Sequence, residues 1–387
     1  MAFKYTINSN TETIDFQQVA ELLEKVGLVK TVDADLQEKV FRNSDETIFV
    51  KDGDRIIGVG RALSDGIAQA AIYAQEMDHK GRFIRQKNRF TTPFGHREGQ
   101  LPIEKHRYRL LVSYACPWAH RQLIVLKLLG LDQVISIGFV DPVRPTGLGR
   151  TDWAFTLDKD KKDPVLGIPY LSDIYLQTDP NYQGRFTVPA VVDLKTGKLV
   201  NNDYFNLTRY WETEWTSFHK IGAPDLYPKE YRQSIDELNE IIFEDINNGV
   251  YQAGFATDQK VYEENFDKVF NRLEELEDRL SRTRYLLGNQ ITESDIRLYV
   301  SLVRFDIAYY NGFNLNWKRL VDFPNLWHYA RDLYQIPAFK DTTHFDHIKK
   351  HYHLSATINP HQILPKGADT SIWLEPHDRA KFEKKEN

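Results

Sequence analysis

Residues 109–130 read RLLVSYACPWAHRQLIVLKLLG and contain Cys116, the single cysteine of the 387-residue chain. The apolar run Leu110–Val112 predicts a buried strand of the kind found in parallel sheets. After the cysteine, apolar residues at helical spacing predict a helix that begins at Pro117 and ends at Gly130. Cys116 therefore falls where a strand is followed by the N-terminus of a helix. Free N–H groups and the helix dipole favour a thiolate at that place.

A lone cysteine can also be a small buried hydrophobic side chain. The strand–Cys–Pro–helix context favours a reactive nucleophile with a lowered pKa over that alternative. We expect Trp118 to pack at the start of the helix. His120 and Arg121 are expected to brace the helix rather than to act in catalysis.

The length of 387 residues favours two or three domains. The chain has 41% hydrophobic and 13% aromatic residues, enough to bury sizeable cores. The net charge of -5 gives no reason to expect a nucleic-acid partner. One cysteine excludes a disulfide framework and a CxxC metal site, and we expect no metal. Because neither an apolar leader nor a run of membrane-spanning length is visible, the sequence predicts a cytoplasmic protein without membrane contact.

Residues 1–74 predict a small α+β module. Apolar residues at helical spacing predict a helix over Asp15–Leu28, and the Asp52-Gly53 pair predicts a hairpin within Thr47–Leu63. A third strand is expected over Gln69–Met77. The pattern resembles the first half of a GNAT-type acetyltransferase, but the Gly-rich loop that grips the coenzyme A pyrophosphate in that family is missing. We interpret the segment as a truncated GNAT-like or docking module without acetyltransferase activity.

The rest of the chain shows strand signals first and helical signals later. Val188-Pro189 precedes a second buried strand, and a short strand over Lys198–Val200 leads into a helix. Thr292 and Asp295 have the spacing of a capping box, which marks a helix start and implies no catalysis. We expect an extended arm (75–105), an α/β domain (106–211), an all-helical domain (212–350) and a tail that wraps the surface (351–387).

Nine stretches occur in a fixed order between Gly81 and Gly367: GRFIRQKNRF, VSYACPWAHRQLIVLKLLGL, DWAF, GRFTVPAVVD, NNGVYQAGFA, LVRFDIAYYNGF, FPNLWHYARDLYQ, HIKKHYH and INPHQILP. Together they resemble the glutathionyl-hydroquinone reductases, the Xi class of glutathione transferases. The resemblance implies an α/β thioredoxin-like domain that binds glutathione, followed by the all-α C-terminal domain of glutathione transferases (GSTs). The small α+β module would precede both.

The resemblance also implies roles for single residues. Cys116 matches the nucleophile, and Tyr251 matches the proton donor and acceptor. Tyr309 and Tyr352 match two tyrosines that lower the pKa of the cysteine in the family. The positions that match glutathione contacts are Trp153, Arg185, Phe186, Thr187, Val188, Asp203 and Tyr204. The bond before Pro189 is implied to be cis, and extended backbone before a proline can offer its polar groups to a peptide-like ligand.

The chain departs from the family's pattern at two positions. Where members usually carry Glu-Ser, it has Asp203-Tyr204. Asp203 can still meet the ammonium group of the ligand, but Tyr204 replaces a small hydroxyl at a helix start, where a carboxylate would bind. The substitution leaves open whether glutathione or another thiol is used. Gly312 stands where the family commonly has His.

The predicted function is the thiol-dependent reduction of glutathionyl-hydroquinones, which are small aromatic thioethers, with glutathione as co-substrate. The Cys116 thiolate attacks the glutathionyl sulfur, Tyr251 protonates the aromatic carbon, and a mixed disulfide forms. Because the chain has no second cysteine, a second glutathione must release the first. The alternatives are a general glutathione-dependent thiol transferase or deglutathionylase, a conventional transferase, and a weakly catalytic GST-like binding module. The resemblance also implies a homodimer.

Overall fold

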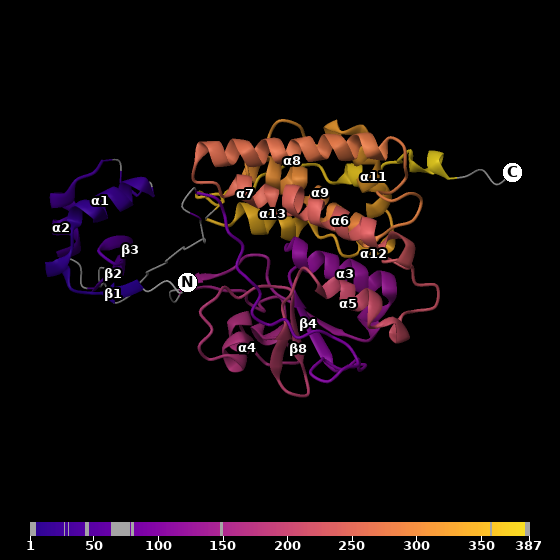
Figure 1. The fold of residues 1–387 in the computed structure, drawn as a ribbon, viewed down its shortest axis with the longest axis horizontal. Helices are drawn as coiled ribbons and strands as arrows, with labels where there is room; N and C mark the ends of the chain where they lie inside the picture. Colours follow the sequence, from indigo (N-terminus) through magenta and orange to yellow (C-terminus); the bar gives the residue numbers. More distant parts are fainter. Residues whose placement is uncertain are drawn as a thin grey trace. The chain divides into compact units, whose positions relative to one another are not determined.

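The computed structural model describes residues 5–26, 28–29, 31–42, 46–62, 78, 81–147, 150–356 and 358–383 (Figure 1). The chain forms two compact units. The smaller unit comprises Met1–Ala74 with Thr146–Thr151, and the larger one comprises Gln75–Pro145 with Asp152–Asn387. None of the described helices combines the length and the apolar character that a membrane span needs.

The smaller unit is an antiparallel sheet packed against two helices. The strand order is β1-β2-β3, with β1 Tyr5–Asn8, β2 Glu46–Asp52 and β3 Arg55–Ala62, and the helices are α1 Phe16–Lys25 and α2 Ala34–Arg42. The predicted hairpin is confirmed, and Gly53 takes the positive φ of 60° that its turn requires. The core is aromatic: the rings of Phe16, Phe41 and Phe49 lie within 6.2 Å of one another.

Within residues 1–74 of this unit, the strand β1 and the helix α2 were not predicted. The strand expected over Gln69–Met77 lies outside the described residues. A two-stranded hairpin, β6 Thr146–Gly147 and β7 Arg150–Thr151, belongs to the same unit.

The predicted fold class is confirmed in the larger unit, which begins with a thioredoxin-like domain. Its sheet has the order β5-β4-β8-β9, with β4 Tyr108–Val112, β5 Ser136–Phe139, β8 Ala190–Asp193 and β9 Lys198–Asn201. The pairing of β4 with β5 is parallel, and that of β4 with β8 is antiparallel, so the sheet is mixed rather than parallel. The helices of this domain are α3 Pro117–Leu129, α4 Leu171–Thr178 and α5 Leu207–Thr213. In Figure 1, α3 and α5 lie on the side of the sheet that faces the later helices.

Helix α3 forms as the sequence predicts. Cys116 is the N-cap, Pro117 occupies the first helical position, and Gly130 ends the helix with a left-handed φ of 77°. Twelve of the thirteen helical residues are buried, Lys127 being the exception. Because the helix is buried nearly all round, it fixes the position of Cys116 firmly.

Residues 81–105, in the expected arm, contain no helix, but they do more than extend over the surface. Phe83, Phe94 and Leu101 are buried. The Phe94 ring packs against the rings of Tyr108 at 5.0 Å and Trp211 at 5.1 Å. The segment is therefore part of the core of the larger unit.

The second domain of the larger unit is helical, as predicted. Its α-helices are α6 Arg232–Ile242, α7 Gly249–Gly254, α8 Gln259–Leu280, α9 Glu293–Arg304, α10 Tyr310–Gly312, α11 Pro324–Tyr334, α12 Pro337–Lys340 and α13 Phe345–His353. Two π-helical turns interrupt them, at Phe243–Asn247 and Phe305–Tyr309. Short 3-10 turns in the chain are Thr11–Thr13, Leu131–Gln133, Lys159–Lys161, Thr216–Phe218, Lys229–Tyr231, Leu320–Asp322, Ser371–Leu374 and Arg379–Phe382.

The capping box at the start of α9 is confirmed. The carboxylate of Asp295 accepts hydrogen bonds from the Thr292 N–H at 2.8 Å and from the hydroxyl of Tyr329 at 2.9 Å. The role of this pair is structural, as expected from the sequence.

The last described residues pack on the helical domain. Trp373 is buried and its ring lies 4.8 Å from that of Trp327. Arg379 is fully buried and donates hydrogen bonds of 2.9 Å to the carbonyl groups of Leu280 and Arg284. These contacts tie the tail to the end of α8.

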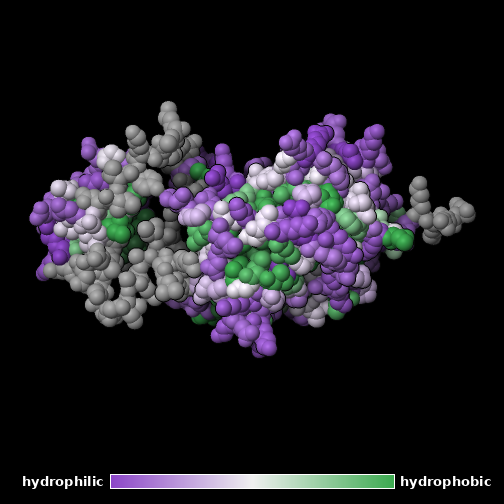
Figure 2. Space-filling view, turned by 90° about the horizontal axis from the view of Figure 1, so that it is seen from below, coloured by the Kyte–Doolittle hydropathy of each residue, from purple (hydrophilic) through white to green (hydrophobic). Residues whose placement is uncertain are grey.

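Figure 2 shows a hydrophobic area on the viewed face of the larger unit, bordered by hydrophilic residues. Exposed apolar areas of this kind can be contact surfaces. The homodimer stays a prediction, which light scattering of the purified protein would test.

Candidate active site

Cys116 lies at the junction of the strand β4 and the helix α3. The side chain is 8% exposed, and its Sγ lies 3.4 Å from the carbonyl oxygen of Val188. The bond between Val188 and Pro189 is cis, as the resemblance implied. The thiol therefore faces the backbone that the sequence assigned to the binding of a peptide-like ligand.

The prediction of a lowered pKa for Cys116 is wrong for the thiol as it lies in this structure. Burial raises the pKa, and it outweighs the backbone N–H groups of Ala119 and Trp118 and the charge of Arg304, which act downward. The hydrogen bond to the Val188 carbonyl also favours the protonated thiol. The helix start thus acts as predicted, but desolvation is the larger effect.

Three tyrosines from the helical domain meet in the same region. The hydroxyl of Tyr352, in α13, lies 2.6 Å from that of Tyr251, in α7, and 3.4 Å from that of Tyr309, at the end of a π-helical turn. Burial raises the pKa of all three, and the negative charge of Cys116 adds to this for Tyr251 and Tyr309. The phenols therefore stay protonated at neutral pH. Their hydroxyl groups are hydrogen-bonded to one another rather than to Sγ.

Arg304 was not predicted as a site residue. It donates hydrogen bonds of 3.0 Å to the carbonyl groups of Tyr114 and Ala115, which directly precede the cysteine. Its Nη1 also lies 3.1 Å from Nδ1 of His120, which is buried in α3 as expected. A helical-domain cation thus fixes the loop before Cys116. Its motif, LVRFD, contributed to the resemblance, but no role followed from that.

Arg85 was also missed, because residues 75–105 were expected to form only an arm. Its guanidinium carbon lies 4.5 Å from the ring centre of Trp118, 5.0 Å from that of Tyr251 and 5.8 Å from that of Tyr204. Its Nε donates a hydrogen bond of 3.1 Å to Oδ1 of Asn248. A cation therefore lies among the aromatic rings beside the cysteine.

The residues predicted to contact glutathione lie around the thioredoxin-like domain. The Trp153 ring stacks on that of His351 at 5.2 Å, next to Tyr352 in the sequence. The N–H of Arg185 donates to Oε1 of Gln86 at 2.6 Å, and the carbonyl of Thr187 accepts from the hydroxyl of Tyr175 at 2.7 Å. Phe186 is half-buried between them. The stretch that ends at Val188 is thus held by side chains on both sides.

Asp203 and Tyr204 differ in what they offer. Oδ1 of Asp203 accepts 3.3 Å hydrogen bonds from the N–H groups of Phe205 and Asn206, so the carboxylate holds the turn that precedes α5. The N–H of Tyr204 is bonded to the carbonyl of Asn202 at 2.9 Å. The Tyr204 ring packs against Trp118 at 4.9 Å, on the side of Arg85. The ring therefore belongs to the aromatic part of the site.

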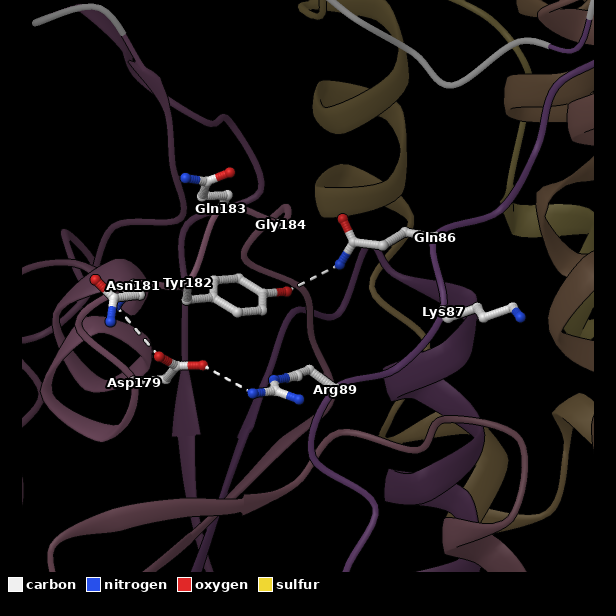
Figure 3. A pocket seen from close by; sticks show the side chains of 8 residues that line it. All are labelled: Gln86, Lys87, Arg89, Asp179, Asn181, Tyr182, Gln183 and Gly184. Carbon is white, nitrogen blue, oxygen red and sulfur yellow. Dashed lines mark hydrogen bonds and ion pairs between the residues drawn. The ribbon is translucent and has the colours of Figure 1, made fainter. Parts of the chain in front are cut away.

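A polar hollow of about 440 Å³ lies next to this region (Figure 3). Its lining residues are Gln86, Lys87, Arg89, Asp179, Asn181, Tyr182, Gln183 and Gly184. None of the predicted catalytic residues lines it, and hydrogen bonds cross it between Gln86 and Tyr182 and between Arg89 and Asp179. We do not assign it to the chemistry at Cys116.

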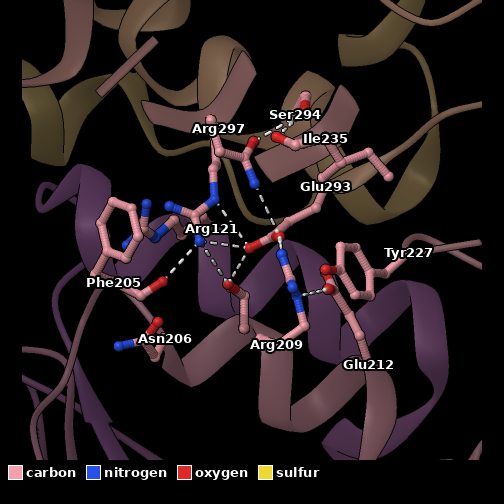
Figure 4. A network of polar contacts seen from close by, with 12 residues as sticks. Arg121, Phe205, Asn206, Arg209, Glu212, Tyr227, Ile235, Glu293, Ser294 and Arg297 are labelled. Atoms are coloured by element: carbon pink, nitrogen blue, oxygen red, sulfur yellow. Dashed lines mark hydrogen bonds and ion pairs between the residues drawn. The ribbon is translucent and has the colours of Figure 1, made fainter. Parts of the chain in front are cut away.

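A buried charge network joins α9 of the helical domain to α5 and the loop before it (Figure 4). Glu293, in α9, pairs with Arg297 at 2.6 Å and with Arg209 at 2.9 Å. Arg297 donates to the carbonyl of Phe205 at 2.6 Å, and Arg121 donates to the carbonyl of Tyr204. These two guanidinium groups hold the loop that carries the predicted ligand residues. Arg121 thus braces this loop, whereas the sequence predicted only that it braces the helix α3.

Comparison with known proteins places this geometry in a family. Residues 115–214 match the family model "Glutathione S-transferase, N-terminal domain", and residues 259–332 match "Glutathione S-transferase, C-terminal domain". The chain thus has the two-domain structure of a glutathione transferase.

Individual relatives show to which class of glutathione transferases the chain belongs. Glutathionyl-hydroquinone reductase YqjG of Escherichia coli is 43% identical over 73% of this chain and 85% of its own length. Glutathionyl-hydroquinone reductase PcpF of Sphingobium chlorophenolicum is 37% identical over 79% of this chain and 95% of its own. The crystal structure of the Xi glutathione transferase from Phanerochaete chrysosporium superposes with a TM-score of 0.74 at 40% identity, covering 80% of this chain and 99% of that one. The chain belongs to the Xi class of glutathione transferases, the glutathionyl-hydroquinone reductase family.

Both family models match residues outside the module of residues 1–74, so they leave its GNAT resemblance untested. The likeness to half of an acetyltransferase therefore stays a sequence-based prediction.

Proposed function

We propose that this protein reduces glutathionyl-hydroquinones to hydroquinones with glutathione as reductant. In this proposal, residues 106–211 bind the glutathionyl group, and residues 212–350 supply the tyrosines that handle protons. The observation that carries the proposal is a chain of three protonated phenols from the helical domain, two of which, Tyr251 and Tyr309, are close enough to the only thiol of the chain for its charge to raise their pKa. A thiol exchange between disulfides would need no such proton donors.

The first half of the reaction forms a mixed disulfide. Tyr251 donates a proton to the ring carbon that bears sulfur, and the Cys116 thiolate attacks that sulfur. The carbon–sulfur bond breaks, its electron pair stays with the ring, and Cys116 becomes bonded to the glutathionyl sulfur. The ring is reduced and the two sulfurs are oxidised. Tyr352, at 2.6 Å from Tyr251, can return a proton to it.

The second half restores the thiol. Since the chain contains one cysteine, a second glutathione must attack the mixed disulfide from outside. Glutathione disulfide leaves, and the Cys116 thiolate is regenerated. In this proposal Trp153, the stretch from Arg185 to Val188, and Asp203 hold the glutathione molecule in both halves.

The test is turnover of a glutathionyl-hydroquinone by the full chain, with mass spectrometry of Cys116. Single-turnover reaction without free glutathione should add one glutathionyl group to Cys116 and release one hydroquinone. The Cys116→Ser variant should do neither, because a serine hydroxyl cannot form the disulfide. Release of hydroquinone by that variant would contradict the proposal.

The alternative of a general thiol transferase makes a different prediction. Such an enzyme would reduce a glutathione mixed disulfide well and a glutathionyl-hydroquinone poorly, and Tyr251→Phe would affect neither. If Tyr251→Phe removes only the hydroquinone activity, the reductase proposal stands and the alternative fails.

A further inference from the structure

The Arg85 guanidinium carries a positive charge that no carboxylate neutralises. Among the ion pairs of the described residues, none involves Arg85, and its hydrogen bond goes to a neutral amide, that of Asn248. Its Nη2 is buried and has no hydrogen-bond acceptor within the described part of the chain. A partly buried cation without a counterion is unfavourable unless an anion joins it.

The surroundings of Arg85 fit an aromatic anion. The faces of Trp118 and Tyr251 lie within 5.0 Å of the guanidinium carbon, and the ring of Tyr204 lies at 5.8 Å. A flat aromatic ligand can pack among such rings, which a hydrated carboxylate would not favour. Arg85 also lies near both reacting groups of the proposed mechanism. Its guanidinium carbon is 5.0 Å from the ring centre of Tyr251, and its charge acts to lower the pKa of Cys116 and of Tyr251 against the larger, upward effect of burial.

We propose that Arg85 binds the phenolate oxygen of the hydroquinone as it leaves, and so is a catalytic residue of this site. The inference rests on the proposed function. When Tyr251 protonates the ring carbon that bears sulfur, one ring hydroxyl gives its proton to the Tyr251 phenolate left behind, and the ring becomes a keto tautomer in which that oxygen is a carbonyl. When the carbon–sulfur bond breaks, the electron pair passes through the ring to that carbonyl oxygen, which becomes a phenolate. A guanidinium donor at that oxygen stabilises charge that develops only in the transition state.

The first test needs no turnover. A nitrophenol, whose phenol and phenolate forms differ in colour, is titrated with pH in the presence of saturating protein. In the wild-type protein we expect bound nitrophenol to ionise at lower pH than free nitrophenol. Arg85→Met should abolish this shift, and Arg85→Lys should keep part of it, because the charge remains while the fork of donors is lost.

The matched control is Arg89→Met, which removes a guanidinium from the same segment. The Arg89 side chain is 67% exposed and its ion-pair partner is Asp179, at 3.5 Å. The control should bind and ionise nitrophenol as the wild type does. Thermal unfolding of all variants shows whether each is folded.

The second test separates the effect of Arg85 on the leaving phenolate from its effect on the reactivity of the Cys116 thiol. Arg85→Met should lower hydroquinone turnover roughly a hundredfold, the usual effect of losing one donor to a developing oxyanion. Reduction of a glutathione mixed disulfide, where no phenolate forms, should fall only as far as the alkylation rate of Cys116 falls.

Several results would overturn the inference. One is a nitrophenol titration that is the same in the wild type and Arg85→Met, or absent from both. Another is a turnover loss that the alkylation rate accounts for completely. A third is a rise in the half-saturation concentration of glutathione with the phenolate shift intact, which would assign Arg85 to a carboxylate. If the wild type lacks reductase activity but ionises bound nitrophenol through Arg85, the proposed function fails and the anion site remains.

Discussion

The hydroxyl groups of Tyr251 and Tyr352 lie 2.6 Å apart, although 101 residues separate them in the chain. The hydroxyl of Tyr309 also lies 3.4 Å from the hydroxyl of Tyr352. A negative charge on Cys116 raises the pKa of Tyr251 and of Tyr309, so both phenols lie within electrostatic reach of the thiolate. A proton given up by Tyr251 can be replaced by the hydroxyl of Tyr352.

Replacing Tyr352 by Phe should therefore slow the reductase without stopping it. Loss of one hydrogen bond between neutral groups costs about 1 kcal/mol, which corresponds to roughly a fivefold lower rate. Tyr251→Phe removes the proton donor itself and should cost roughly a hundredfold or more. Turnover of a glutathionyl-hydroquinone measures both.

The control for this pair is Tyr262→Phe. The hydroxyl of Tyr262 donates a hydrogen bond to the carbonyl of Asn314 at 2.7 Å, and neither residue is part of the candidate site. Equal losses from Tyr262→Phe and Tyr352→Phe would show that the Tyr352 effect is one of stability rather than of proton transfer.

The rate should rise with pH through the neutral range. Burial raises the pKa of Cys116, so at neutral pH the thiol is protonated, and the reactive thiolate becomes more abundant as the pH increases. The tyrosines do not oppose this trend, because burial also raises their pKa values and they stay protonated. Alkylation of Cys116 by iodoacetamide should follow the same pH profile. An inflection clearly below the free-thiol value of about 8.5 would contradict the raised pKa.

Features that depend only on neighbouring residues in the chain were predicted correctly from the sequence. Cys116 at the N-cap of a helix follows from its neighbours alone, as does the turn at Gly53. The pKa of Cys116 could not be predicted in this way, because burial comes from residues distant in the chain. Arg304 was missed for the same reason: it reaches the loop before the cysteine across 189 residues.

Arg85 shows a second limit of sequence reasoning. A basic stretch rich in loop formers looks like an exposed arm, since no periodicity reveals a buried face. Its aromatic neighbours Trp118 and Tyr251 come from two other segments of the chain. The only signal that could have pointed to Arg85 was its place in GRFIRQKNRF, the first of the family motifs.

Glu293→Gln should destabilise the protein strongly. Burial acts to raise the pKa of Glu293, but the charges of Arg297 and Arg209 lower it to about 2. Removing this charge leaves the buried guanidinium of Arg297 without its counterion, whereas Arg209 keeps Asp236 at 2.8 Å. Breaking a buried pair in this way costs about 3–5 kcal/mol. The wild-type contribution is present above the unfolded pKa of about 4.3 and is lost as the pH falls toward 2. Urea unfolding measures the change, and Asp278→Asn, in an exposed pair with Arg282, should cost no more than about 1 kcal/mol.

Glu212→Gln should have the opposite effect on stability and raise the free energy of unfolding. Neither carboxylate oxygen of Glu212 has a hydrogen-bond partner among the described residues, and burial and the charge of Glu293 raise its pKa well above the ordinary value. The folded state thus favours the neutral acid, and its stability falls as the pH rises above the unfolded pKa of about 4.3. A neutral amide avoids that loss. Glu212→Gln should unfold at higher urea concentration than the wild type at pH 8, and a lower midpoint would contradict the protonated state.

Tyr204→Ser restores the residue type that the family usually carries, and it should not weaken the use of glutathione. The ring of Tyr204 packs against Trp118, while its N–H is bonded to Asn202 and its carbonyl to Arg121, so the backbone stays held after the change. The half-saturation concentration of the aromatic substrate should rise, because a wall of its pocket is lost. Tyr204→Phe is the matched control, since it keeps the ring and removes only the hydroxyl. If both variants raise the half-saturation concentration of glutathione roughly tenfold or more, the Tyr204 hydroxyl binds the charged ligand, since such a bond contributes about 1.5–3 kcal/mol.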